Sequence, residues 1–287
     1  MQEFHGRVAV VTGAASGIGF ALAERAGREG MTVVLSDIEA GALATAAASL
    51  KDRGVEVLTH RTDVSDPASV MALAEMVFSE LGAVHLLCNN AGVYNRPRPT
   101  WEHTESDWRW VLDVNLWGVI HGIRSFVPRM LASGEEGHIV NTASMAGLVT
   151  GGIGTAVYDA SKHAVLSLSE SLYKDLVTRQ TKVSASVLCP GSVMTNIFTA
   201  ERNRPAGDGE ASTEPVATPT LPEDSFPPEE MANQVFAAVR ENRFYVLAAQ
   251  TVMYEWTKMG HDRMWEGKNP AVPRRLIAAR EAAEASG

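Results

Sequence analysis

The chain is poor in cysteine: its 287 residues include only Cys88 and Cys189. Both end apolar runs, and neither belongs to a CxxC pair or to a Cys/His spacing typical of metal sites, so the sequence indicates two free buried thiols. The eight histidines are scattered without an HExxH-type pair. We therefore expect no metal site, and histidines that serve surface or packing roles.

Positive charge is also scarce, and long hydrophobic runs are absent. The chain has 25 Lys and Arg against 34 Asp and Glu, a net charge of −9, which disfavours nucleic acid as a partner. The uncharged stretch from Val8 to Ala23 is too short for a membrane span, and three glycines interrupt it. We expect a soluble cytoplasmic protein, and the 45% hydrophobic content is typical of a folded globular domain.

Short β-branched runs alternate with longer helical patterns, as in βαβ units that build a parallel sheet. We predict a single α/β domain over residues 1–287, doubly wound around a parallel sheet of about seven strands with helices on both faces. The expected strands are 7–12, 32–37, 55–60, 84–89, 137–142, 182–189 and 244–247. The expected helices are 17–29, 40–53, 67–81, 105–131, 157–179, 229–241 and 251–265.

A proline-rich stretch interrupts this alternation. Residues 201–228 contain six prolines among Gly, Ser, Thr and Glu, a composition that predicts an irregular, mobile loop. We expect an insertion over residues 195–228 and a C-terminal tail over residues 268–287.

The first expected strand ends in a glycine-rich turn that leads directly into a helix. Gly13, Gly17 and Gly19 let the backbone turn tightly and approach a pyrophosphate, whose charge the helix N-terminus favours. A glycine trio alone is weak evidence, but the strand, turn and helix context predicts dinucleotide binding.

Asp37 ends the second expected strand, eighteen residues after Gly19. A carboxylate at this point can accept hydrogen bonds from the adenosine ribose and would repel a 2′-phosphate. Ser16 also stands where an Arg or Lys would help to bind that phosphate. We predict NAD rather than NADP, with a simple turn-capping role for Asp37 as the alternative.

Further motifs follow the later strands. They are Asp63-Val64, Asn89-Asn90-Ala91-Gly92, Asn115, Ser144, Tyr158-Asp159-Ala160-Ser161-Lys162, and Pro190-Gly191 with Thr195. With the glycine turn they make residues 6–195 resemble the short-chain dehydrogenases/reductases. The resemblance implies a Rossmann-type fold, a homodimer or homotetramer, and an NAD(P)-dependent enzyme that interconverts a secondary alcohol and its ketone by hydride transfer.

Tyr158 and Lys162 are four residues apart, so a helix places them on one face about 5–6 Å apart at Cβ. A free Tyr has a pKa near 10, and an acid/base near neutrality needs a pKa about three units lower, roughly 4 kcal/mol. An ammonium together with the positive nicotinamide ring could supply most of this shift. An exposed Tyr/Lys pair without function is the alternative.

The resemblance assigns four catalytic residues. Tyr158 is the general acid/base, Ser144 hydrogen-bonds the reacting oxygen, and Lys162 lowers the Tyr158 pKa and binds the nicotinamide ribose. Asn115 holds a water that links Lys162 to solvent, with a packing hydrogen bond as its alternative role. Ser144 lies one residue further from Tyr158 than is commonest in the family, but it directly follows a strand, so we choose it over Thr142.

The resemblance also locates the ligands. The expected cofactor contacts are Gly13, Ser16, Gly17, Ile18, Gly19, Asp37, Asp63, Val64, Asn90, Tyr158, Lys162, Pro190, Gly191, Val193 and Thr195. The expected substrate contacts are Tyr94, Met145, Met194 and Phe198. These apolar side chains, with further aromatic residues between 253 and 265, favour a bulky hydrophobic or aromatic substrate, and core or subunit-interface packing is the alternative.

Small residues also form a stripe on the helix that carries Tyr158, comprising Ala160, Ala164, Ser167 and Ser171. Such a stripe lets another helix approach closely. The resemblance to the short-chain dehydrogenases/reductases implies that the other helix comes from a second subunit, with a helix of the same chain as the alternative.

Two other functions stay open. One is a noncatalytic dinucleotide-binding redox sensor, which the set Tyr158, Lys162, Ser144 and Asn115 argues against. The other is a nucleotide-sugar epimerase or dehydratase of a related fold, which usually has a shorter glycine spacing and a larger substrate domain.

Overall fold

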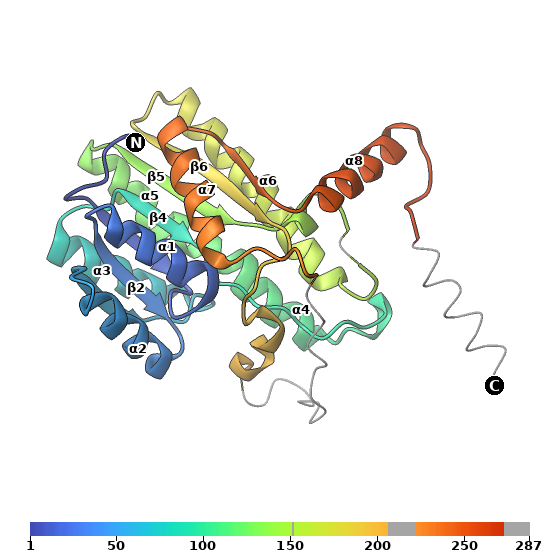
Figure 1. Ribbon diagram of the computed structural model, residues 1–287, viewed down its shortest axis with the longest axis horizontal. Helices are drawn as coiled ribbons and strands as arrows, with labels where there is room; N and C mark the ends of the chain where they lie inside the picture. The colour runs from blue at the N-terminus through green and yellow to red at the C-terminus, as the bar shows by residue number, and fades with distance from the viewer. Residues whose placement is uncertain (151, 206–221, 273–287) are drawn as a thin grey trace. The chain divides into compact units, whose positions relative to one another are not determined.

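The computed structural model describes residues 1–150, 152–205 and 222–272. The chain divides into two compact units, Met1–Gln250 and Thr251–Gly287. The first unit contains a seven-stranded sheet in the order β3-β2-β1-β4-β5-β6-β7, with every neighbouring pair parallel (Figure 1). Its strands are β1 Val8–Thr12, β2 Thr32–Asp37, β3 Val57–Arg61, β4 Leu86–Asn89, β5 Gly137–Thr142, β6 Val183–Pro190 and β7 Tyr245–Ala248. The predicted fold class is confirmed.

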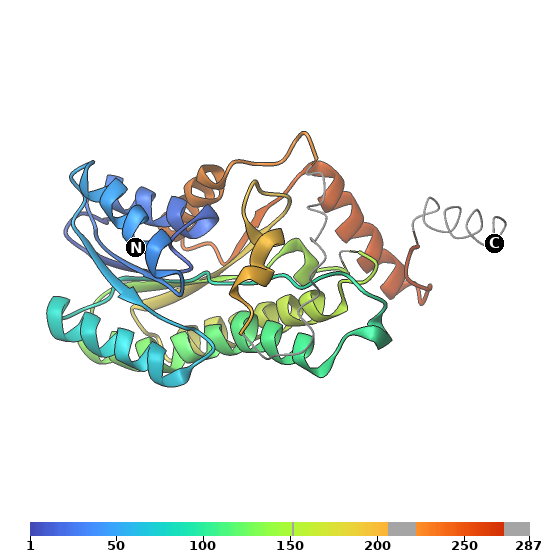
Figure 2. The same ribbon diagram turned by 90° about the horizontal axis from the view of Figure 1, so that it is seen from below.

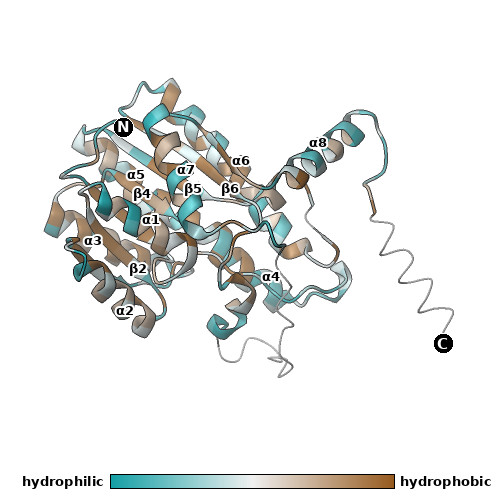
Figure 3. Cartoon of the chain, viewed as in Figure 1, coloured by the Kyte–Doolittle hydropathy of each residue, from teal (hydrophilic) through white to brown (hydrophobic). Residues whose placement is uncertain are grey.

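Helices cover both faces of this sheet, as Figure 2 shows from the edge. One face packs against α1 (Gly17–Arg28), α2 (Ala40–Lys51) and α7 (Pro228–Glu241), which share one hydrophobic cluster. The other face packs against α3 (Pro67–Leu81), α5 (Gly118–Ser133) and α6 (Ala156–Thr178), which share a second. The central strands β1, β4 and β5 are fully buried between these helices. Apolar residues predominate in the sheet (Figure 3), as is typical of parallel strands covered on both faces.

The direction of winding positions the site. From β1 the chain moves outward to β3, then returns to place β4 on the other side of β1. The connections that follow β1 and β4 therefore diverge and leave a crevice at their carboxyl ends, where ligands bind in open α/β sheets.

The expected helix over 105–131 is interrupted. It consists of α4 (Glu105–Leu112), a π-helical turn (η2, Asp113–Trp117) and α5. A π-helical turn holds one more residue than an α-helical turn, so the face that points inward shifts at Asn115, which is completely buried. Thr104 begins α4 with a capping box in which its side chain and that of Asp107 bond each other's backbone N–H.

The prediction of an irregular segment over 201–228 is wrong at both of its ends. A 3₁₀ helix, η4 (Ile197–Asn203), reaches into the segment, and α7 begins at Pro228. Phe226 also forms a parallel β-bridge with Val193. The rest of this prediction falls mainly on residues 206–221, outside the described part of the chain. Shorter 3₁₀ turns that the sequence did not predict are η1 (Thr100–Glu102) and η3 (Met145–Gly147).

The second unit begins with α8 (Thr251–Trp265), which matches the predicted helix. None of its residues is buried, and Tyr254, Trp256, Met259 and Trp265 are exposed. These side chains are therefore not core residues. Most of the expected tail, residues 273–287, lies outside the described part.

Several predictions about individual side chains can be compared with the structure. Cys88 and Cys189 are free and buried, as predicted. On α6, Ala160, Ser167 and Ser171 are exposed, so packing of the small-residue stripe against a helix of the same chain is not observed. Within the described ranges, no helix is long and apolar enough to cross a membrane, and no cluster of three metal-ligand side chains is found there.

Candidate active site

The glycine turn between β1 and α1 requires its glycines. Gly13 and Gly17 have φ angles of +63° and +56°, which residues with a Cβ rarely adopt. A Cβ on Gly19 would lie 2.0 Å from the Gly13 carbonyl oxygen, and one on Gly13 would lie 2.8 Å from Ala91 Cα. These positions therefore need to lack a side chain, and at Gly13 the turn packs closely on the segment after β4.

The N-terminus of α1 fits an anionic ligand. Ser16 is the N-cap residue but makes no side-chain capping hydrogen bond, and the first turn contains no acidic residue. Amide groups at such a helix end are suited to phosphate oxygens. Thr195 reaches the same place from beyond β6, since its Cγ2 would be 3.2 Å from a Cβ on Gly17.

Asp37 lies beside the turn and already has two hydrogen bonds. Its Oδ2 accepts from Ala15 N at 2.9 Å, and its Oδ1 accepts from Glu39 N at 3.0 Å. The turn-capping role that was the alternative is therefore present. It is compatible with ribose binding, because a carboxylate offers about four acceptor positions.

Thr12 connects the ends of β1 and β4, a role that sequence reasoning did not assign although Thr12 begins the glycine motif. Its Oγ1 accepts from Asn90 N at 3.0 Å and from Ala91 N at 3.1 Å. Asn90 Nδ2 donates in return to the Thr12 carbonyl at 3.0 Å. The two loops that flank the crevice are thus held in register.

The other predicted cofactor residues also follow strand ends. Asp63 Oδ1 accepts from Ser65 N and Oγ, and the Val64 carbonyl lies 3.0 Å from His121 Nδ1. Gly191, which follows the last residue of β6, donates its N–H to Ala248 at 2.8 Å. Ile18 lies in the first turn of α1 and packs against the core. Pro190 and Val193 flank Gly191.

Tyr158 and Lys162 project from one face of α6. Lys162 Nζ is 5.7 Å from the centroid of the Tyr158 ring and donates to the Thr142 carbonyl at 3.0 Å. A Cβ on Gly92 would lie 3.4 Å from both Lys162 Nζ and Asn115 Oδ1. The structure therefore brings Tyr158, Lys162 and Asn115 together.

Ser144 is the hydroxyl residue that faces Tyr158. Its side chain lies close enough to that of Tyr158 to lower the pKa of the phenol, and it accepts from Ala146 N at 3.1 Å. The Thr142 hydroxyl instead donates to Asn90 Oδ1 at 3.4 Å. This arrangement supports the choice of Ser144 over Thr142.

Asn115 is tied to two parts of the site. Its Oδ1 accepts from Val93 N at 2.8 Å, and its Nδ2 donates to Val93 O and Ser161 Oγ, each at 3.0 Å. The packing role that was its alternative is therefore present in the structure.

Electrostatics differ from the expectation based on the Tyr/Lys spacing. Burial raises the pKa of Tyr158 to about 12, although the hydrogen bond with Ser144 lowers it. Burial also lowers the pKa of Lys162 to about 8. In the protein alone, removal from water thus outweighs the nearby amine, and Lys162 by itself does not make Tyr158 readily ionisable.

Three aromatic rings lie in a row, with Tyr94 between Tyr158 and Phe198. The Tyr94 ring lies 5.0 Å from that of Tyr158, and the Phe198 ring lies 5.2 Å from that of Tyr94, both edge to face. Two of the four expected substrate residues thus form an apolar wall beside the candidate acid/base. Met194 is 50% exposed, whereas Met145 is 2% exposed and offers no open surface to a substrate.

Comparison with known proteins agrees with this geometry. Residues 7–206 match the short chain dehydrogenase family. The chain belongs to this family. It is 40% identical over 277 residues to the 1-deoxy-11-beta-hydroxypentalenate dehydrogenase of Streptomyces avermitilis, which covers 92% of this chain and 96% of that protein.

Solved structures of the family extend the comparison. A short chain dehydrogenase/reductase from Burkholderia phymatum in complex with NAD is 42% identical, with a TM-score of 0.88 over 95% of this chain and 99% of that one. A metagenomic short-chain oxidoreductase in complex with NADP is 28% identical, with a TM-score of 0.69 over 86% of this chain and 98% of that one. This chain is thus an NAD(P)-dependent dehydrogenase of the family.

Proposed function

We propose that this enzyme interconverts a bulky, hydrophobic secondary alcohol and its ketone, prefers NAD, and uses Tyr158 as its general acid/base. The observation that carries the proposal is the Tyr158 ring, with the Lys162 amine 5.7 Å from its centroid and Ser144 close enough to lower the pKa of the phenol. Lys162 contacts Thr142 at the carboxyl end of β5, and the glycine turn follows the carboxyl end of β1 in the same parallel sheet.

Each residue then has a defined task. Tyr158 Oη accepts the proton of the substrate hydroxyl during oxidation and donates it during reduction. Ser144 Oγ hydrogen-bonds the same substrate oxygen and stabilises the charge that develops on it. Lys162 supplies positive charge beside the phenol, and its contact with Thr142 O holds the amine in place. Asn115 lies next to Lys162 and holds a water through which the proton reaches solvent. The bound nicotinamide supplies the hydride acceptor or donor.

The raised pKa of Tyr158 gives the cofactor a second role. Because burial holds this pKa at about 12 in the protein alone, the phenol stays protonated until additional positive charge arrives. A bound oxidised nicotinamide would supply such a charge beside the phenol.

The preference for NAD rests on the charges that follow β2. Asp37 lies beside the glycine turn, and Glu39 follows two residues later. Arg202, from η4, pairs with Glu39 at 2.7 Å, and this pairing also lowers the pKa of Glu39. Arg61, on β3, donates from Nε to the Ile38 carbonyl at 3.1 Å. Both guanidiniums thus already have partners, and the Asp37 carboxylate beside the turn disfavours a 2′-phosphate.

The substrate class rests on the wall of Tyr94 and Phe198 beside Tyr158. Aromatic side chains in a pocket favour a large apolar ligand. The Streptomyces avermitilis relative is likewise named for a hydroxylated pentalenate.

Formation of NADH from a panel of alcohols tests the proposal. Tyr158→Phe is expected to lower kcat by about 100-fold to 10,000-fold, the usual contribution of a general acid/base, while NAD still binds. Tyr173→Phe is the matched control, since Tyr173 lies on the same helix but packs on Phe244. Turnover by Tyr158→Phe close to that of the wild type would refute the role of Tyr158.

The same assay tests the cofactor and the class of function. We expect kcat/KM with NAD to exceed that with NADP at least about tenfold, a difference of roughly 1.4 kcal/mol, and equal values would contradict the preference. Tight NAD binding without turnover of any alcohol would favour the redox-sensor alternative.

A further inference from the structure

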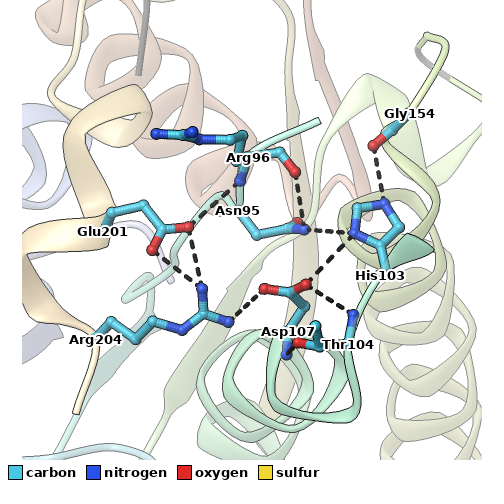
Figure 4. A network of polar contacts seen from close by, with 8 residues as sticks. All are labelled: Asn95, Arg96, His103, Thr104, Asp107, Gly154, Glu201 and Arg204. Atoms are coloured by element: carbon cyan, nitrogen blue, oxygen red, sulfur yellow. Dashed lines mark hydrogen bonds and ion pairs between the residues drawn. The ribbon is translucent and has the colours of Figure 1, made fainter. Parts of the chain in front are cut away.

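A buried polar network joins three segments that are far apart in the sequence (Figure 4). Each of these segments carries one of the three neighbouring rings, Tyr94, Tyr158 or Phe198. Asn95 and Arg96 directly follow Tyr94, Gly154 precedes Tyr158 by four residues, and Glu201 lies in η4 with Phe198. The network therefore connects the same segments as the three rings.

Arg204 is the residue of the network that holds η4. Its Nη2 pairs with Asp107 Oδ1 at 2.5 Å and its Nη1 with Glu201 Oε2 at 3.1 Å, while its guanidinium lies 4.9 Å from the centroid of the Trp110 ring. The Arg204 and Asp107 side chains are only 12% and 7% exposed. Water screens such a pair much less than a surface pair, so Arg204 firmly attaches η4 to α4.

Asp107 is held as an acceptor for Arg204. Burial by itself would raise the pKa of Asp107, but hydrogen bonds from Arg204 and Thr104 outweigh burial and lower it. Its Oδ2 accepts from Thr104 N at 2.9 Å. One carboxylate thus begins α4 and binds the arginine of η4.

His103 connects α4 to the other two segments. Its Nε2 lies 3.1 Å from the Gly154 carbonyl, so Nε2 must carry the proton, and Nδ1 is then free to accept from Asn95 Nδ2 at 3.2 Å. The Gly154 carbonyl also accepts from Arg98 N at 3.1 Å. Gly154 has φ +80°, and a Cβ there would lie 2.8 Å from Arg98 N, which keeps this approach specific for glycine.

We propose that the network centred on Arg204, Asp107 and His103 positions Phe198 and Tyr94 against Tyr158, and so makes the enzyme selective for bulky over small alcohols. The proposal rests on the function proposed above. Arg204 does not touch the Tyr158 ring and acts through η4, so it is a positioning residue. Because its role is to place the wall, its loss affects substrates in proportion to their contact with that wall.

Kinetics with two alcohols of different size test this inference. For Arg204→Met we expect kcat/KM for 1-(2-naphthyl)ethanol to fall about tenfold, since small misplacements of binding groups have effects at least of this size. Most of the fall is expected in KM. For 2-propanol, kcat/KM should stay within about twofold, as should the KM for NAD. Arg204→Lys keeps the charge and should recover part of the loss.

A surface arginine on α4 provides the matched control. Arg109 pairs with Glu105 at 2.5 Å, but the two side chains are 72% and 78% exposed. Arg109→Met therefore removes an arginine–carboxylate pair outside the network and should leave both alcohols unaffected. An equal loss for both alcohols in Arg204→Met, or no loss for either, would overturn the inference.

Hydrogen exchange supplies a readout that is independent of turnover. In the wild type, Thr199 N and Arg204 N donate within η4 and at its end, and these amides should exchange faster in Arg204→Met but not in Arg109→Met. Unchanged exchange would contradict the attachment of η4 through Arg204. If Arg204→Met does not fold, Glu201→Gln weakens the contacts of Glu201 with Arg204 and with Arg96 N in the same network and is judged by the same two measurements.

The two proposals fail in different ways. If the wild type oxidises neither alcohol, the proposed function fails, and hydrogen exchange still decides whether Arg204 holds η4. If the wild type oxidises both but Arg204→Met does not change their ratio, only the positioning inference fails.

Discussion

Replacing Asn115 with Ala tests how the site is built into the fold. The Asn115 side chain has no exposed surface. It bonds both backbone groups of Val93, in the segment after β4, and also Ser161 on α6. One side chain thus joins the π-helical turn to the two segments that carry Tyr94 and Tyr158.

The expected cost follows from the partners that lose their bonds. Val93 N–H and Val93 O are left in a buried position, and an unsatisfied buried group costs about 1–3 kcal/mol. The hydrogen bond to Ser161 adds about 1 kcal/mol. A water in the vacated space can satisfy one of the Val93 groups, so we expect Asn115→Ala to lower the free energy of unfolding by about 2–4 kcal/mol.

Urea unfolding, with Ser161→Ala and the double variant, measures this cost and apportions it. Ser161→Ala alone removes one of the three bonds, and the coupling energy in the double-mutant cycle should be about 1 kcal/mol. A loss below about 1 kcal/mol in Asn115→Ala would refute the reasoning, because it would mean that the Val93 groups find other partners at little cost.

Two further predictions concern pH and packing. Burial lowers the pKa of His138 from 6.5 to about 3, so below pH 6.5 the unfolded chain binds a proton that the folded chain refuses. The free energy of unfolding should therefore fall by about 1.4 kcal/mol per pH unit on this account, and the unfolding curves of His138→Gln should lack this component between pH 7 and pH 5. Gly19→Ala should abolish NAD binding in a titration, since its Cβ would overlap the Gly13 carbonyl, whereas Gly41→Ala meets no atom within 4 Å and should bind NAD normally. Binding by Gly19→Ala at wild-type affinity would contradict the close packing of the turn.

Much of the fold could be predicted from the sequence because helix and strand periodicity is local. The strand over 137–142 and the helices over 67–81 and 251–265 have the predicted bounds. The interruption of the helix expected over 105–131 could not be predicted, because a π-helical turn leaves the apolar pattern largely unchanged. The turn accompanies the burial of Asn115 between two other segments of the chain.

Some of the site residues could also be predicted, because their motifs are local in the sequence. Tyr158 and Lys162 share a helix face at a spacing of four residues, and the glycine turn is a contiguous motif. Thr12 begins that motif, but its hydrogen bonds to Asn90 and Ala91 join residues that are 78 and 79 positions apart. Contacts over such a separation have no local signature in the sequence. Met145 looked available as an apolar residue after a strand, but the structure buries it.

The sequence by itself determined the parallel α/β architecture, the glycine-rich turn and the spacing of Tyr158 and Lys162, because each depends on residues close together in the chain. Only the tertiary structure decided that Ser144 rather than Thr142 faces Tyr158. It likewise decided that Arg204, at the end of η4, pairs with Asp107 on α4. It also decided that Tyr158 is buried deeply enough for the loss of water to raise its pKa in the protein alone. These outcomes depend on how far each group is removed from water and on which distant segment supplies its partner, and neither is encoded in local periodicity.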